Sequence, residues 1–256
     1  MISYKEYGYY LKKSFLNASE KKFLLKMGNN ILSEYIPIKN IKSFEDLKLH
    51  RKLIDLRKKY PKKFGEMYDK FILSSSLRKI FYKEKFINIF AKLLNAKPDN
   101  IFINGYMFRF DAPYDKRNSL DWHQDSPYYQ MTHPKYNSGV CWVSITKNSL
   151  KNGSLNFIPG SHKKGFIKTS SKKGQKLASE QFTLKVDRKS KKKIKVMNTN
   201  FGDAAFFDMN LKHKSGLNNS SKIRMTIGCR FHNMNEEFNY GKEKYIFDKT
   251  SKSTLF

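Results

Sequence analysis

The stretch Trp122-His123-Gln124-Asp125 carries a histidine and a carboxylate two residues apart. Side chains alternate between the two faces of an extended chain, so His123 and Asp125 should point the same way and Gln124 the other way. One imidazole and one carboxylate are two of the three ligands of the 2-His-1-carboxylate triad, which holds iron(II) in non-haem oxygenases. This pair alone occurs often by chance. The rest of the chain must therefore supply a second histidine and a group that binds a cosubstrate.

His213 is the best candidate for the third ligand among the six histidines of the chain. It follows Gly202-Asp203, which predicts a turn, and the apolar run 204–207, which predicts a buried strand. Ser215 shares the face of His213 if the chain is extended, and Arg224 begins the next predicted strand. An arginine beside a metal ligand is a fork-shaped partner for a carboxylate, and a nearby hydroxyl adds a hydrogen bond.

The other histidines are expected to have no part in metal binding. His50 lies in a helical region and is expected to be exposed, whereas His162 belongs to a Pro-Gly-Ser-His turn and is expected to be structural. His133 and His232 are expected to be surface or hydrogen-bonded histidines.

Residues 1–98 are expected to form a mainly helical support, because apolar residues recur there at helical spacing with lysines between them. Ser43 is a candidate N-cap, since Glu45 and Asp46 would then place negative charge in the first helical turn. Ser74 to Ser76 is expected to cap a later helix. The 256 residues suit one large domain, and we treat the chain as a single domain with a C-terminal tail at 236–256.

Residues 99–235 are expected to form the β-rich core. Candidate strands are Ile101–Phe110, Val140–Thr146, Leu155–Pro159, Ala204–Phe207 and Met225–Phe231. Asn152-Gly153 predicts a hairpin turn between two of these strands. Many short strands separated by turn residues are typical of a β-sandwich or a barrel-like roll. The sequence therefore predicts a mainly β fold with flanking helices.

A basic segment at about 163–195 interrupts the predicted strands. It is rich in lysine, and its only acidic residues are Glu180 and Asp187. A solvated insertion is one interpretation, and a lid or a docking surface for an anionic substrate is the other. The formal charge of +29 invites a nucleic-acid interpretation. However, 8 of the 51 basic residues are arginine and 51 − 8 = 43 are lysine. Arginine is preferred for phosphate and base recognition, so this composition argues against nucleic acid.

The cellular setting is predicted from absences. No apolar run reaches the ~20 residues of a membrane span, and the first residues lack the apolar block of a secretory signal. Cys141 and Cys229 lie in apolar runs and are expected to be buried free thiols. These features predict a cytoplasmic protein.

The ordered set of motifs resembles the phytanoyl-CoA dioxygenase family. The resemblance rests on Trp122 to Asp125, on Trp142, on the run from Lys151 to His162, and on Gly202-Asp203 followed by His213, Ser215, Asn218, Ser220 and Arg224. It spans roughly residues 100–232. It implies a double-stranded β-helix, that is, a cupin-like jelly-roll, with N-terminal helices. It also implies iron(II), 2-oxoglutarate and O₂ as cofactor and cosubstrates.

The resemblance also assigns residues to roles. His123, Asp125 and His213 would be the catalytic iron ligands, Arg224 and Ser215 would bind the distal carboxylate of 2-oxoglutarate, and Trp142 would be an aromatic wall beside it. Arg109, Tyr128 and Tyr129 are candidates for contact with the substrate, although Arg109 could equally form an ordinary salt bridge.

The resemblance implies a reaction as well, the hydroxylation of an aliphatic C–H bond of a small metabolite, with release of succinate and CO₂. Related halogenases lack the carboxylate ligand, so Asp125 favours hydroxylation. The basic composition points to an anionic substrate. Two alternatives stay open, a nucleic-acid- or anion-binding protein on an oxygenase-like scaffold and a non-catalytic member of the family.

Overall fold

The structure is a computed structural model, and it describes residues 2–38, 40–128, 137–167, 170–172 and 181–234. Tyr129, His133 and the tail 236–256 lie outside the described residues, as do parts of the basic segment.

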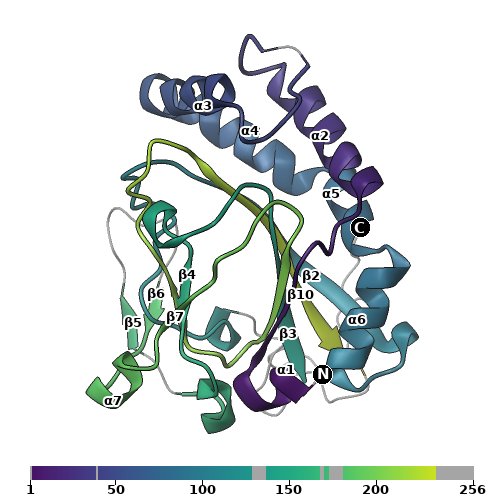
Figure 1. Cartoon of the computed structure of the whole chain (residues 1–256), viewed down its shortest axis with the longest axis vertical. Helices are drawn as coiled ribbons and strands as arrows, with labels where there is room; N and C mark the ends of the chain where they lie inside the picture. Colours follow the sequence, from purple (N-terminus) through teal and green to yellow (C-terminus); the bar gives the residue numbers. More distant parts are fainter. Residues whose placement is uncertain (1, 39, 129–136, 168–169, 173–180, 235–256) are drawn as a thin grey trace, which may run out of the picture.

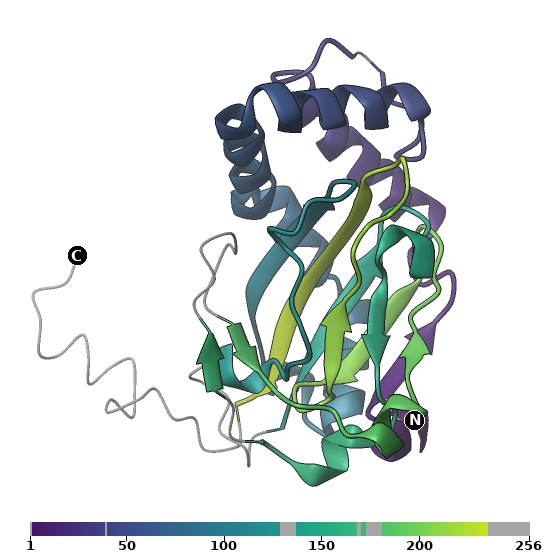
Figure 2. The ribbon, with the colours of Figure 1, turned by 90° about the vertical axis from the view of Figure 1, so that its left-hand side faces the viewer.

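Two antiparallel β-sheets face each other at the centre of the molecule (Figure 2). The larger sheet consists, in spatial order, of β1 (Tyr9–Lys12), β8 (Ala204–Asp208), β3 (Ser138–Ser144), β10 (Arg224–Asn233) and β2 (Ile101–Asp111). The smaller sheet consists of β7 (Lys195–Val196), β4 (Leu155–Phe157) and β9 (His213–Ser215). A separate pair is formed by β5 (Ser170–Lys172) and β6 (Gln181–Thr183). This arrangement is a double-stranded β-helix with flanking helices, so the predicted jelly-roll is confirmed.

A layer of helices packs on the outer face of the larger sheet (Figure 1). The helices are α1 (Ile2–Tyr7), α2 (Ala18–Leu32), α3 (Leu47–Lys59), α4 (Pro61–Leu73), α5 (Ser75–Phe81) and α6 (Glu84–Leu94). The short α7 (Arg188–Lys191) lies apart from this layer, near β5 and β7 (Figure 1). The expected helical support is present, but β1 was missed. β1 is a four-residue strand at the edge of the sheet, and its pairing with β8 depends on a partner almost 200 residues away.

The helix starts show which capping predictions hold. The N-cap of α3 is Asp46, whose carboxylate accepts from the backbone of Lys48, so the prediction of Ser43 as the N-cap is wrong. Aspartate and serine are equally good N-caps, so residue type does not decide between Ser43 and Asp46. The helix begins at Leu47, and this makes Asp46 the cap. Ser74 does cap α5 by accepting from Ser76, as expected.

β10 has one face towards the helices and the other towards the smaller sheet. Its outward-facing residues, among them Met225, Ile227 and Phe231, are fully buried against the helices in the main hydrophobic core. Its inward-facing residues, among them Arg224 and Thr226, point between the two sheets, where the apolar residues form a second cluster. The period of two in a β-strand therefore gives this strand an apolar face and a polar face.

Asn152-Gly153 does not form the predicted hairpin turn, because β3 belongs to the larger sheet and β4 to the smaller one. The chain crosses between the sheets there through a short 3-10 turn at Leu150–Asn152. Gly153 has φ of 77°, and a Cβ on it would lie 2.5 Å from the carbonyl oxygen of Gly216. The Asn-Gly pair therefore serves a left-handed conformation and a close approach of two loops.

Cys141 and Cys229 are free, buried and directly opposite each other on β3 and β10, as predicted for core thiols. Among the described residues, none of the helices is long and apolar enough to cross a lipid bilayer.

Candidate active site

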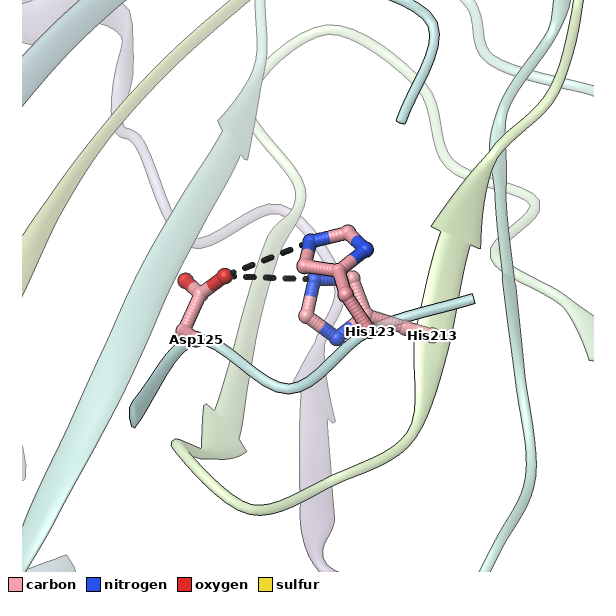
Figure 3. Close-up of side chains that lie close together, drawn as sticks. All are labelled: His123, Asp125 and His213. Atoms are coloured by element: carbon pink, nitrogen blue, oxygen red, sulfur yellow. Dashed lines mark ion pairs between the residues drawn. The ribbon is translucent and has the colours of Figure 1, made fainter. Parts of the chain in front are cut away.

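His123, Asp125 and His213 converge between the sheets (Figure 3). His213 is the first residue of β9, and its backbone exchanges two hydrogen bonds with His123, at 2.9 and 3.0 Å. The backbone N–H of Asp125 donates to the carbonyl of Met209, at 2.9 Å. One ligand atom from each of the three side chains lies within 4.8 Å of the other two, and all three residues are buried.

Both imidazoles are held by their Nδ1 atoms. His123 Nδ1 lies 2.6 Å from the carbonyl oxygen of Asp121, and His213 Nδ1 lies 2.9 Å from that of Leu211. A carbonyl oxygen can only accept, so in each ring the proton is on Nδ1 and the lone pair on Nε2. The two Nε2 atoms lie 3.5 and 3.6 Å from Oδ1 of Asp125. Such a carbonyl contact orients a metal-binding histidine and fixes its tautomer.

The electrostatics keep this group ready to bind a cation. Burial and the neighbouring His123 lower the pKa of His213 to about 4, so its imidazole is neutral at pH 7. Burial alone would raise the pKa of Asp125, but Arg230 and the two histidines outweigh it and hold that pKa well below its usual range. The neutral His213 and the ionised Asp125 are therefore in the forms that bind a metal ion.

Arg224 lies at the start of β10 with 1% of its surface exposed. Its Nη2 donates to Oδ2 of Asp111 at 2.6 Å, whereas its Nε and Nη1 have no hydrogen-bond partner. The hydroxyls of Ser215 and Thr226 are also buried without partners. Unpaired polar groups are costly inside a protein, so this set of groups suits a bound polar ligand.

The residues present fit the groups that the sequence implied. Two imidazole nitrogens and one carboxylate oxygen on one side of a buried space suit an octahedral iron(II) with open positions. The unpaired donors of Arg224 with the hydroxyl of Ser215 suit a buried carboxylate such as that of 2-oxoglutarate.

Trp142 and Arg109, two other predicted site residues, have different neighbours from each other. Trp142 lies on the inner face of β3, opposite Gly228 of β10, and packs with the apolar residues between the sheets. Arg109 donates to Asp111 at 3.1 Å and to the carbonyl of Asn118 at 2.6 Å, so the salt-bridge alternative describes its contacts here.

Tyr128 stands beside the metal-binding group. Its ring centroid lies 5.8 Å from that of His123 in an edge-on arrangement. Its hydroxyl accepts from the backbone N–H of Phe182 in β6, at 2.9 Å. The backbone of Leu184 donates to the carbonyl of Trp122, at 2.8 Å. Residues 182–184 of the basic segment are therefore hydrogen-bonded to the loop that carries His123 and Asp125.

Of the described residues, His50, His162, His232 and Gln124 are not part of the candidate metal-binding group. Gln124 faces away from it and bonds to the backbone at Gly165, Ile167 and Asn210, in agreement with the alternation argument. His50 is 1% exposed, so the expectation of an exposed side chain is wrong. Its Nδ1 accepts from the backbone of Ile223 and so joins α3 to the loop before β10. His232 is also buried and lies between Ser138 and Asn104.

Three polar residues at the site were missed from the sequence. Asp111 holds Arg224, Thr226 adds an unpaired hydroxyl, and Arg230 contacts Asp125. A signal for two of them was present, since Arg224, Thr226 and Arg230 are separated by even numbers of residues and share one face of a strand.

A cavity of about 530 Å³ lies beside Ser215, between the segments 116–121 and 214–219. Lys116 and Lys214 line it together with Asn156 and Asn219. Asp121 adds a carboxylate to this lining, and Asn156 and Lys214 are paired on the face of the smaller sheet opposite to His213 and Ser215, so the cavity lies outside the inter-sheet space.

The family model of phytanoyl-CoA dioxygenase, PhyH, matches residues 4–226. The chain belongs to this family. The match includes the N-terminal helices as well as the motifs of the core, and it agrees with the resemblance noted in the sequence. A search of curated proteins found no sequence relative.

Solved structures share the fold at low sequence identity. EctD from S. alaskensis, solved with 2-oxoglutarate and 5-hydroxyectoine, is 16% identical with a TM-score of 0.60, over 93% of this chain and 76% of that chain. EvdO2 from Micromonospora carbonacea var. aurantiaca, complexed with 2-oxoglutarate, is 14% identical with a TM-score of 0.59, over 91% and 89%. The epimerase SnoN, in complex with Fe³⁺, alpha ketoglutarate and nogalamycin RO, is 13% identical with a TM-score of 0.61, over 91% and 81%.

Family membership and the His-Asp-His group together support an iron- and 2-oxoglutarate-dependent oxygenase in general terms. The relatives differ in outcome, since SnoN is an epimerase, so the type of reaction needs a separate argument.

Proposed function

We propose that the chain is an Fe(II)/2-oxoglutarate-dependent dioxygenase that hydroxylates an aliphatic C–H bond of a small anionic metabolite and releases succinate and CO₂. One observation carries the proposal. A buried group of two histidines and a carboxylate lies in the same inter-sheet space as a fully buried arginine with unpaired donors. A structural core has no use for either feature, because both are costly without ligands.

In this proposal His123, Asp125 and His213 hold the iron. Arg224 and Ser215 bind the distal carboxylate of 2-oxoglutarate, and Trp142 forms an apolar wall between the sheets. Bound iron(II) and 2-oxoglutarate would supply the electrons that activate O₂. The chain orients the two Nε2 lone pairs through the Asp121 and Leu211 carbonyls and keeps water away from the clamp by burial.

Two features support the finer parts of the proposal. Asp125 occupies the ligand position that halogenases of this kind leave open for a halide, and this favours transfer of oxygen to the substrate. The net charge of +29 favours an anionic substrate over a cationic one.

The test is anaerobic addition of iron(II) and then 2-oxoglutarate to the purified protein. We expect a metal-to-ligand charge-transfer band, which requires both groups on one site. His213→Ala should abolish the band because it removes one of three ligands. His162→Ala is the matched control and should keep it, since the ring of His162 contacts the backbone of Lys5, outside the site.

The substrate class is tested by succinate formation in air against a set of small anionic, neutral and cationic metabolites. Stimulation by anionic compounds, with hydroxylated product seen by mass spectrometry, is the expected result. No band with the wild-type protein, or an undiminished band with His213→Ala, would refute the proposed function. Stimulation by cationic compounds alone would refute the proposed substrate class.

A further inference from the structure

Arg230 is a second arginine on the inner face of β10, partly buried, and it has no role in the proposed function. Its Nε and Nη2 both donate to Oδ2 of Asp125, at 3.2 and 2.9 Å. Its side chain is 12% exposed and that of Asp125 is 5% exposed. The other carboxylate oxygen, Oδ1, is the one that lies near the two histidines. The two oxygens of Asp125 therefore have different partners.

An irregularity in β2 brings a second acceptor to Arg230. The pairing of β10 with β2 shifts register between Gly228 and Arg230, which is a β-bulge. On β2, Gly105 lies within the bulge and has φ of 55°. Its carbonyl oxygen accepts from Nη1 of Arg230, at 3.1 Å. The guanidinium thus donates to Asp125 on one side and to the bulged strand on the other, and bulges are common next to active sites.

We propose that Arg230 is a positioning residue of the metal centre, which engages Oδ2 of Asp125 so that the carboxylate offers the metal Oδ1 alone, and whose charge cancels the charge of that carboxylate. This inference rests on the proposed function, because it concerns how the same site holds its metal and its cosubstrate.

The first consequence concerns coordination. A carboxylate can bind a metal through one oxygen or through two. Three single-atom ligands leave three positions open on an octahedral ion, and a two-oxygen carboxylate would leave two. Because the guanidinium holds Oδ2, it keeps the third position available.

The second consequence concerns charge. With Arg230 in place, the carboxylate and its partner sum to zero, so a bound divalent metal presents its full charge to an incoming dianion. Without Arg230 the same site is one unit more negative. Loss of this cation should therefore weaken the binding of a dianion to the metal-loaded protein, while the metal itself should bind as well or better.

The test uses cobalt(II) as the metal probe and 2-oxoglutarate as the dianion, in the full-length protein. Calorimetry gives the cobalt(II) affinity and then the 2-oxoglutarate affinity of the cobalt-loaded protein, and the visible d–d spectrum reports the coordination. Arg230→Met removes charge and donors, and Arg230→Lys keeps the charge but not the two-donor contact. Lys85→Met is the matched control, since Lys85 pairs with the buried Glu20 at the start of α2, outside the site.

We expect Arg230→Met to bind cobalt(II) at least as tightly as wild type, to change the spectrum, and to bind 2-oxoglutarate about tenfold more weakly or worse. Arg230→Lys should recover most of the 2-oxoglutarate affinity because it keeps the charge. Its spectrum should still differ from that of the wild type because the two-donor contact is lost. If Arg230→Met does not fold, Arg230→Gln replaces it as the uncharged variant and carries the same expectation.

An unchanged spectrum or an unchanged 2-oxoglutarate affinity in the uncharged variant would overturn the inference, as would the same changes in Lys85→Met. This failure differs from a failure of the proposed function. If wild-type protein binds neither cobalt(II) nor 2-oxoglutarate, the proposed function itself is refuted, whatever the variants do.

Discussion

Replacement of Arg224 by methionine separates binding of the cosubstrate from binding of the metal. The guanidinium is 1% exposed, and its Nε and Nη1 are the unpaired donors that a carboxylate would satisfy. Truncating one partner of a buried charged pair typically costs about 2–5 kcal/mol, which weakens 2-oxoglutarate binding by about 30-fold to several thousand-fold. The hydroxyls of Ser215 and Thr226 remain, so we expect the lower half of that range. Asp111 keeps Arg109 as a partner, so the folded state should survive.

The assay is an anaerobic titration of the iron(II)-loaded protein with 2-oxoglutarate, followed by the charge-transfer band, with iron(II) affinity measured beforehand. Arg224→Lys should recover part of the affinity because it restores the charge without the fork. The matched control is Arg78→Met, since Arg78 lies on α5 and donates to the carbonyls of Leu73 and Ser74. Equal 2-oxoglutarate affinity in Arg224→Met and wild type would show that this arginine is not the clamp. Equal losses of metal and cosubstrate would show that the damage is structural.

Two further predictions concern stability. Burial lowers the pKa of His50, His213 and His232 to about 4, from 6.5, so the unfolded chain takes up protons between pH 7 and 5 that the folded protein does not. The free energy of unfolding of the metal-free protein should therefore fall on acidification, by up to about 1.4 kcal/mol per pH unit for each histidine; equal urea midpoints at pH 7 and pH 5 would contradict this. Gly105→Ala should destabilise the protein by about 1–2 kcal/mol because of its positive φ, and Gly105→Asn should do so less. The alanine variant should also bind 2-oxoglutarate more weakly, because the Gly105 carbonyl helps to hold Arg230. If Gly105→Ala had the thermal stability of the wild type, the role of Gly105 in the bulge would be refuted.

The candidate ligands could be found from the sequence because each depends on local rules. Alternation along an extended chain places His123 with Asp125 and His213 with Ser215. Arg224 could be found because a turn rich in Gly, Asn and Ser separates it from His213. The jelly-roll could be predicted because the motifs occur in family order over most of the core.

Arg230 was missed for a physical reason. The alternation that groups it with Arg224 was visible, but its target, Asp125, is 105 residues earlier in the chain. The bulge in β2 that brings the Gly105 carbonyl to it depends on the register between β2 and β10, which no local pattern encodes. Asp111 was missed likewise, since a carboxylate at the end of a strand is usually solvated, and only the packed sheets show that it is buried between Arg109 and Arg224.

The wrong local predictions have a common cause. Asn152-Gly153 has the composition of a hairpin turn, and the chain uses its left-handed glycine to cross between two sheets. Ser43 and Asp46 were both acceptable caps, and packing of the helix decided for Asp46. His50 sits among lysines in the sequence, yet tertiary contacts bury it. In each case the local sequence was compatible with more than one conformation or degree of burial, and tertiary contacts determined which one forms.

β10 also limits how this protein can change over evolutionary time. Of its ten residues, nine are buried and the other, Arg230, is partly buried and holds a candidate metal ligand. Substitutions facing the helices are filtered by packing, and substitutions facing the other sheet are filtered by chemistry. The strand therefore has almost no room for neutral drift, whereas the lysine-rich outer surfaces can vary freely. A deep mutational scan should show residues 224–233 as one intolerant block rather than the every-second-residue pattern of a half-exposed strand.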